Sequence, residues 1–168
     1  MAIPKVLKNF TVFVDGVGYA GKVAECEPPK LKVKREDFNA GGMAGPRKMD
    51  MGLEAMEATM TFEEYSPELF KQFGLVPGGE VGVTMRGAMQ ANTPDAQAII
   101  AVLRGKFHED DLGTWKPGDK SQFKLTMDVH YYKLTINGED LREIDMDNGV
   151  RIINGTDQMA SVREALGL

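Results

Sequence analysis

The sequence predicts a mainly β fold built from antiparallel hairpins. The first observation is a strict two-residue alternation from Met56 to Phe62, where apolar side chains alternate with Glu and Thr. The second is a similar alternation from Phe123 to Tyr131. The third is a pair of tight-turn signals, Asp15-Gly16 and Asn137-Gly138, each lying between strand-like segments. Alternating strands joined by such turns form antiparallel sheets.

The length and composition indicate one globular domain, residues 1–168, without a membrane span. Apolar residues make up 42% of the 168 residues and charged residues 27%, as in ordinary globular proteins. No apolar run approaches the roughly 20 residues of a membrane helix, and Met1 to Phe10 does not resemble a signal peptide. The lone Cys26 cannot form an internal disulfide. We therefore expect a protein of the cytoplasm, in which Cys26 is a buried small hydrophobe.

The N-terminal segment predicts a hairpin and then a strand. Phe10 to Val14 favours a strand that ends at the Asp15-Gly16 turn, and a second run begins near Tyr19. After two prolines, Lys30 to about Phe38 alternates Leu and Val with Lys, which predicts a strand with one wet face.

The segment from Asn39 to Gly52 predicts the tip of a long hairpin that runs from Lys30 to Tyr65. It contains four glycines and three methionines, has no periodicity of its own and lies between strand-like flanks. Gly41 to Gly45 lacks the Gly-Lys-Ser/Thr ending of a phosphate-binding loop. Composition alone leaves two interpretations open, a floppy surface loop or a contact arm that becomes ordered against a partner.

The middle of the chain predicts a strand, a helix and a second hairpin. Leu53 to Met60 has helix-forming residues, but its alternation and threonines favour a strand. Ser66-Pro67 begins a helix of two to three turns that ends at Gly74. A turn at Pro77-Gly78-Gly79 then leads into a hairpin from Glu80 to Phe107, followed by a polar loop from Phe107 to Lys120.

The C-terminal part predicts a further hairpin and a helix. The type I′ turn at Asn137-Gly138 joins the strand from Phe123 to a strand from Leu141 to Ile144. A short strand follows from Val150 to Ile153. Asp157 is expected to cap a last helix that Gly167 ends.

No arrangement of residues in the sequence predicts catalysis, a metal site or a cofactor. The run from His108 to Asp111 lacks the spacing of a calcium loop or a zinc-protease helix, so we interpret it as a solvated acidic loop. A nucleophile would need one of the two histidines, His108 in the loop or His130 on a strand. The net charge of −5 opposes tight binding of nucleic acid. We expect a protein that is not an enzyme and that functions by assembling with copies of itself.

Several motifs in this order resemble the major tail tube protein of contractile-tailed bacteriophages, a family that also supplies the tubes of R-type pyocins. The resemblance runs from Ile3 to Leu168. The motifs are Phe13-Val14-Asp15-Gly16, Ala40-Gly41-Gly42-Met43, Met49 to Ala58, Leu103-Arg104-Gly105, Tyr131-Tyr132-Lys133-Leu134, Glu143-Ile144-Asp145, Asn148-Gly149-Val150-Arg151, Ile153-Asn154-Gly155 and Leu166-Gly167-Leu168.

The resemblance implies a β-sandwich or half-barrel with a short flanking helix, a C-terminal helix and a long protruding hairpin. Members form hexameric rings in which strands of six subunits complete a continuous inner β-barrel, and the rings stack into a tail tube that conducts DNA. The implied partners are the tail sheath outside, the tape-measure protein inside, and baseplate and tail-terminator proteins at the ends. The implied location is the virion, after assembly in the host bacterial cytoplasm.

The resemblance also implies two sets of site residues. The hairpin tip would be an inter-ring contact arm, with Asn39, Gly41, Gly42, Met43, Pro46, Arg47, Met49 and Met51 as contacts. The wet faces of the two predicted hairpins supply candidate lumen-facing residues, which are Glu57, Thr59, Thr61, Glu63, Thr84 and Arg86. A headless R-type tailocin tube, a secretion-system needle and, from another class, a ligand-binding β-sandwich are the alternative functions.

Overall fold

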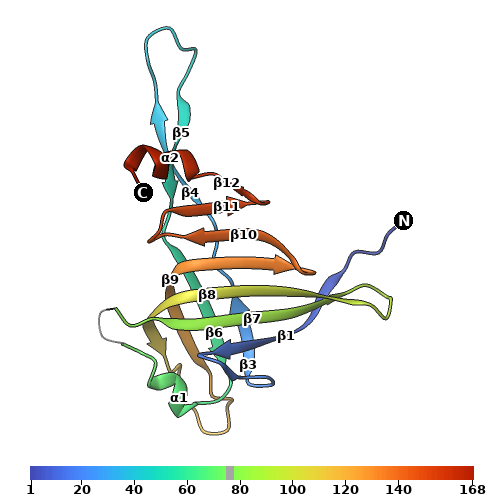
Figure 1. Ribbon diagram of the computed structural model, residues 1–168. Helices are drawn as coiled ribbons and strands as arrows, with labels where there is room; N and C mark the ends of the chain where they lie inside the picture. Colours follow the sequence, from blue (N-terminus) through green and yellow to red (C-terminus); the bar gives the residue numbers. More distant parts are fainter. Residues whose placement is uncertain (75–77) are drawn as a thin grey trace.

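The computed structural model describes residues 1–74 and 78–168 and confirms a mainly β, antiparallel fold (Figure 1). Pro77 of the predicted turn lies outside these residues. One large sheet has the order β12-β11-β10-β9-β8-β7-β1-β2. Its strands are β1 (Val6–Val14), β2 (Val17–Gly18), β7 (Val81–Gln90), β8 (Ala96–Asp111), β9 (Phe123–Ile136), β10 (Glu139–Asp145), β11 (Val150–Ile153) and β12 (Thr156–Asp157).

A second layer lies across the back of this sheet (Figure 1). It consists of β3 (Val23–Glu27), β6 (Met56–Phe62), the first half of β9 and the end of β8 that pairs with it. The long strand β9 belongs to both layers, since residues 123–129 pair with β6 and residues 131–136 pair with β10. Register shifts at Arg104/Gly105 and Phe107/Glu109, where β8 pairs with β9, mark the bend between the layers.

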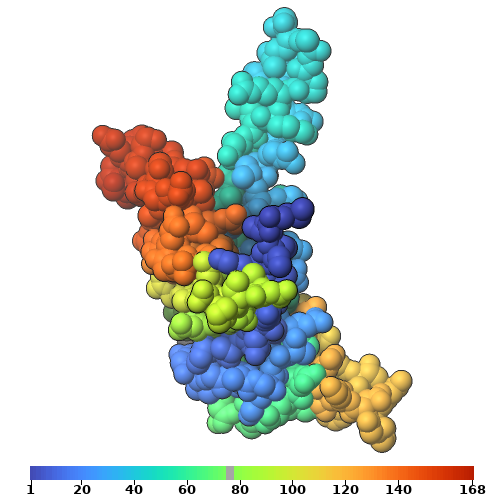
Figure 2. Space-filling view, turned by 90° about the vertical axis from the view of Figure 1, so that its right-hand side faces the viewer, coloured from blue at the N-terminus to red at the C-terminus, as the bar shows by residue number. Residues whose placement is uncertain are grey.

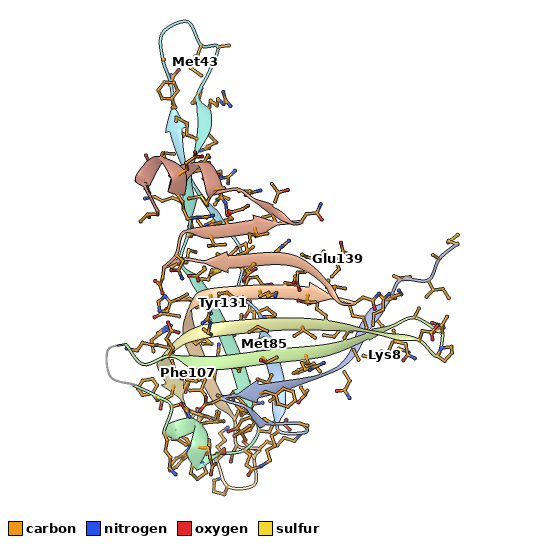
Figure 3. The ribbon with its side chains drawn as sticks, viewed as in Figure 1. Lys8, Met43, Met85, Phe107, Tyr131 and Glu139 are labelled. Carbon is orange, nitrogen blue, oxygen red and sulfur yellow. The ribbon has the colours of Figure 1, made fainter. Side chains whose placement is uncertain are left out.

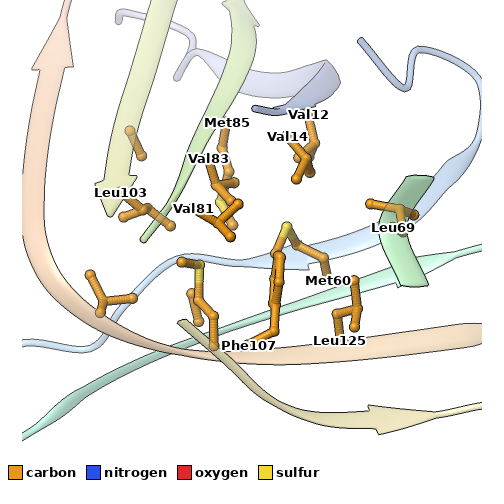
Figure 4. Packing of buried hydrophobic residues seen from close by; sticks show 14 of the residues in the cluster. Val12, Val14, Met60, Leu69, Val81, Val83, Met85, Leu103, Phe107 and Leu125 are labelled. Carbon is orange, nitrogen blue, oxygen red and sulfur yellow. The ribbon is translucent and has the colours of Figure 1, made fainter. Parts of the chain in front are cut away.

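The hydrophobic core fills the space between the two layers (Figure 4). Val81, Val83 and Met85 point into it from β7, and the alternate side chains of β6 face them from the other layer. Met60, Phe62 and Phe123 are fully buried. The strand interpretation of Met56–Phe62 is therefore confirmed over the helix, because only an extended chain buries every second residue.

The first hairpin is shorter than predicted. Asp15 and Gly16 have φ angles of 50° and 80°, which confirms the tight turn. However, β2 has only two residues, and the chain then leaves β1 so that β3 can pair with β6. Tyr19, placed at the start of the second predicted run, is instead a buried core residue whose N–H donates to the Val12 carbonyl at 2.9 Å.

The long hairpin predicted from Lys30 to Tyr65 is wrong in its pairing. The strand β4 (Val33–Phe38) pairs with β5 (Arg47–Leu53) in a separate two-stranded sheet, whereas β6 pairs with β3 and β9. The last part of the predicted tip, residues 47–52, is therefore strand. Gly52, at a φ of 97°, lies at the point where the chain passes from the small sheet to β6.

The polar loop predicted from Phe107 to Lys120 is shorter than expected. Residues 107–111 continue β8 and pair with β9 as far as Asp111 opposite Lys124. Composition did not indicate this extension because the segment is charged. Phe107 is buried in the core, whereas residues 108–111 are exposed and are held through backbone pairing with the neighbouring strand.

Two helices flank the sheets. The first, α1 (Pro67–Phe70), has one turn rather than two to three, and the predicted cap Ser66 donates its hydroxyl to Glu68 instead of capping the backbone. The second, α2 (Ala160–Leu166), ends at Gly167 with a φ of 75°, as predicted. Asp157 lies in β12, ahead of the helix, so its predicted role as the N-cap is wrong. Neither helix of the described residues is long and apolar enough to cross a membrane.

Asp157 nevertheless holds the C-terminal helix in place. Its carboxylate accepts hydrogen bonds from the Met159 N–H at 3.0 Å and from the Arg163 guanidinium, which also donates to the Gly149 carbonyl at 2.8 Å. These bonds lower the pKa of Asp157, with Arg163 as the largest cause. A carboxyl whose pKa is lowered in the folded state stabilises the fold above its unfolded pKa of about 3.9. That contribution is lost as the pH falls through the folded value.

We therefore expect Asp157→Asn to lower the melting temperature at pH 7. The difference from the unmodified chain should shrink as the pH falls from about 3.9 through the lowered folded pKa, because the carboxyl of the unfolded chain is protonated first and that of the native chain only at lower pH. Thermal denaturation followed by circular dichroism across this pH range measures both values. Asp95→Asn, in the exposed turn between β7 and β8, is the matched control and should have little effect. A pH-independent difference for Asp157→Asn would contradict the assignment.

Candidate assembly surfaces

The hairpin of β4 and β5 protrudes from the body of the protein. Both space-filling and ribbon views show it extending beyond the sheets, with Met43 near its far end (Figures 2 and 3). Residues 34–51 are exposed throughout. A two-stranded hairpin with no core is marginal in water, so a partner is needed to hold it rigidly.

One face of this hairpin, which we call the arm, carries three exposed apolar side chains. Phe38 and Arg47 are directly opposite one another, as are Glu36 and Met49, so Phe38, Met49 and Met51 share this face with Glu36 and Arg47. These three side chains are 46–52% exposed. The opposite face is charged and carries the ion pair between Lys48 and Asp37 at 2.5 Å. Grouped exposed apolar side chains of this kind mark an interaction surface.

The predicted contact residues all lie on the arm but in two different settings. The turn at its end holds Asn39, Gly41, Gly42, Met43 and Pro46, whereas Arg47, Met49 and Met51 belong to β5. The sequence indicated the turn through its glycines. It did not indicate Phe38, the largest apolar side chain of the arm, because Phe38 lies just before the glycine-rich segment.

A second exposed apolar surface lies at the opposite end of the molecule, near α1 (Figures 1 and 2). Trp115 is 74% exposed, and its indole N–H donates to the Tyr65 hydroxyl at 3.1 Å. Tyr65 in turn donates to the Leu112 carbonyl at 2.7 Å and contacts Phe70. We call Tyr65, Trp115 and the groove along residues 114–121 the aromatic surface. The sequence suggested only a polar loop here, since a single tryptophan among turn residues carries no periodic signal.

The candidate lumen residues do not share one wall of this chain. Glu57, Thr59 and Thr61 point outward from β6, with the Thr59 hydroxyl 3.3 Å from a Glu27 carboxylate oxygen. Thr84 and Arg86 point outward from β7, on the other side of the core. Glu63 lies beyond the end of β6 and pairs with Lys120 at 3.7 Å. The candidate lumen residues are thus divided between the two layers and do not form the common wet face that the sequence predicted.

The residues considered for catalysis lie in three different settings. Burial raises the pKa of the Cys26 thiol, which keeps it protonated and a poor nucleophile. His130 lies in β9, and its carbonyl accepts a hydrogen bond from Met146 at 3.0 Å. His108 lies at the outer edge of β8, 3.2 Å from an Asp128 carboxylate oxygen.

Comparison with known proteins gives consistent matches. Residues 4–167 match the family described as phage tail tube protein FII. The chain is 30% identical over 172 residues to the tail tube protein of Escherichia phage P2, and all of both chains is covered. It is 32% identical over 150 residues to the major tail tube protein of Serratia phage KSP20, over 88% of this chain and 86% of that protein.

A solved structure has the same fold despite low identity. It is a cryo-EM structure of an extracellular contractile injection system, the PVC sheath/tube terminator in its extended state. The TM-score is 0.62 at 12% identity, with 80% of this chain and 98% of that chain covered. At this identity the likeness shows the fold alone.

Proposed function

Because the chain belongs to the family of phage tail tube proteins, a structural family, we propose that six copies form a ring and that the rings stack into the inner tube of a contractile tail. The observation that carries the stacking is the arm, an exposed hairpin with three exposed apolar side chains on one face and no core of its own. Such a hairpin becomes ordered when a second copy covers it.

Ring formation is supported by the free sheet edges. Among the described residues β3 pairs only with β6, so its other side offers unpaired backbone groups. Val6 and Leu7 at the start of β1 are more than half exposed. Closing such edges between neighbouring subunits completes a continuous inner β-barrel and prevents uncontrolled edge-to-edge pairing.

The tube would then be the passage for DNA. Six chains of net charge −5 give each ring a charge of about −30, which repels DNA rather than retaining it. The lumen wall would carry one of the two outward groups, Glu57, Thr59 and Thr61 on β6 or Thr84 and Arg86 on β7. Glu63, already paired with Lys120, would lie at the margin.

The remaining partners follow from the same role. We propose a sheath outside the tube, a tape-measure protein inside it, and baseplate and terminator proteins at its ends. The chain would act as one structural domain over residues 1–168, without a catalytic role or a cofactor, and would be part of the virion after assembly in the host cytoplasm.

Negative-stain electron microscopy of the purified protein tests this proposal directly. Uniform rings or hollow tubes are expected at high protein concentration. A chain that remains a monodisperse monomer under the same conditions would contradict it.

We propose that the arm binds the aromatic surface of a subunit in the next ring. The arm and the aromatic surface lie at opposite ends of the molecule, so the arm of one ring can reach the aromatic surface of the next (Figure 2). Methionine side chains contact aromatic rings favourably, by about 0.3–1.5 kcal/mol for each contact.

Trp115→Ala should therefore shorten the tubes while leaving the subunit folded. Trp115 is 74% exposed, so its loss removes little from the subunit core. The expected result is a shift from long tubes to rings and short stacks, measured by tube length in electron micrographs and by sedimentation velocity. Asp95→Ala, in the exposed turn between β7 and β8 and outside both the arm and the aromatic surface, is the control and should leave tube length unchanged. Tubes of normal length from Trp115→Ala would exclude the aromatic surface as the receiver.

A further inference from the structure

Three potential metal ligands from three neighbouring strands meet on the outer face of the second layer. They are Glu57 on β6, Asp128 on β9 and His108 on β8, and their ligand atoms all lie within 4.8 Å of one another. Strand register explains this meeting, since Glu57 and Asp128 are directly opposite each other. The register shift between Phe107 and Glu109 lies at His108 on the other side of β9.

The distance between two of the three ligand atoms suits a small divalent ion. The His108 Nδ1 atom and an Asp128 carboxylate oxygen are 3.2 Å apart. Two ligands of a tetrahedral zinc ion, each at 2.0–2.1 Å from the metal, lie about 3.3–3.4 Å apart. Imidazole and carboxylate are both zinc ligands, and the imidazole favours zinc-like transition metals over Mg²⁺ and Ca²⁺.

In the described part of the chain, the negative charges of Glu57 and Asp128 are not neutralised by a neighbouring lysine or arginine. Two carboxylates directly opposite each other on neighbouring strands repel. Among the ion pairs of the described residues, Asp128 pairs only with His108 and Glu57 has no partner. Lys106 is opposite Asp128 in register, and Lys30 and Lys32 line the same groove as Glu57, but none of them is within ion-pair distance of either carboxylate.

We propose that Glu57, His108 and Asp128 bind one divalent transition-metal ion of the zinc class in each chain. The ion ties β6, β9 and β8 together on their outer face, with water completing its coordination. Bound metal therefore stabilises the fold by mass action, because the unfolded chain does not hold the three ligands together. All three ligands come from one chain, so the site is tested on the subunit itself.

The test is a titration of chelator-treated protein with Zn²⁺ by calorimetry. We expect one ion bound for each chain and a higher melting temperature in excess Zn²⁺, with no such effect from Mg²⁺. Loss of a ligand should weaken binding by at least the 10–100-fold that loss of a supporting partner costs. His108→Asn, Glu57→Gln and Asp128→Asn should each show this loss.

The chain contains one matched control, because His130 is its only other histidine. His130→Asn should bind Zn²⁺ with unchanged affinity. Nuclear magnetic resonance of the histidine rings gives a second measurement that needs no variant, since Zn²⁺ should shift the signals of His108 and not those of His130. Equal binding by His108→Asn and His130→Asn, no saturable binding, or no selective shift of His108 would each overturn the proposal.

Discussion

Replacing Ala40 to Met51 with a two-residue turn is expected to abolish tube formation while leaving the subunit folded. The arm forms its own two-stranded sheet and exchanges no backbone ladder with the main sheets. Residues 34–51 are exposed, so their removal takes nothing from the core. The base of the hairpin remains closed by the bond from the Glu54 N–H to the Lys32 carbonyl, at 2.8 Å.

The measurement compares stability with assembly in the same variant. We expect the free energy of unfolding to change by no more than about 1 kcal/mol, because loop length affects stability only weakly. Electron microscopy should show single rings or dispersed subunits in place of tubes. Long tubes from the shortened chain would contradict the arm assignment, whereas loss of the fold would contradict its structural independence.

A second variant tests whether the exposed apolar side chains of the arm, and not only its length, are needed for stacking. Changing Phe38, Met49 and Met51 together to Ser keeps the length of the hairpin but removes these side chains. If apolar contact with the next ring holds the stack, this variant should resemble the shortened chain. As a control, Lys48→Ser on the opposite face removes the exposed Asp37 pair and should cost little, since exposed ion pairs contribute about 0–1 kcal/mol.

Gly105→Ala is expected to destabilise the subunit by about 3 kcal/mol or more, or to prevent folding. Gly105 is buried at the register shift where β8 pairs with β9, at the bend between the two layers. A Cβ atom at this position would lie 1.7 Å from the backbone oxygen of Asp128. Backbone on the central strand β9 cannot move aside without disturbing the pairing on both of its sides, so the close approach requires glycine.

Gly82→Ala is the matched control. Gly82 lies on the neighbouring strand β7, where it pairs with Arg104 of β8. A Cβ atom on Gly82 would meet nothing within 4 Å. Chemical denaturation should therefore give a midpoint for Gly82→Ala close to that of the unmodified chain. If Gly105→Ala had the same midpoint as Gly82→Ala, the close approach of Gly105 to the backbone of β9 would not be a constraint on the fold.

The local elements were largely predictable because their signals are local. Alternation identified β6 and the first half of β9, and the Asn137-Gly138 turn has the positive φ angles of 49° and 79° that a type I′ turn needs. Gly167 ends α2 as expected. The tail tube family was likewise indicated by short motifs along the chain, and the family match over residues 4–167 confirmed it.

The strand pairings were less predictable because pairing is a property of distant segments. Lys30 to Tyr65 was predicted as one hairpin, since the two halves are neighbours in sequence. Instead, β4 pairs with β5. The strand β6 buries its apolar side chains against those of β7 and β1, which stabilises the fold more than pairing with the exposed β4 would. The short β3 was missed as a separate strand because its alternation is weak. It forms because its backbone pairs with β6.

By itself the sequence determined the antiparallel β class, the turns, the glycine-rich end of the arm and the family of tail tube proteins, because each depends on residue types at short spacing. Only the tertiary structure decided which strands pair, how the candidate lumen residues divide between two faces, and which side chains from separate strands meet. The aromatic surface and the group of Glu57, His108 and Asp128 arise from bends and registers in strands far apart in sequence. Such contacts depend on the packing of the whole chain, and no short segment encodes them.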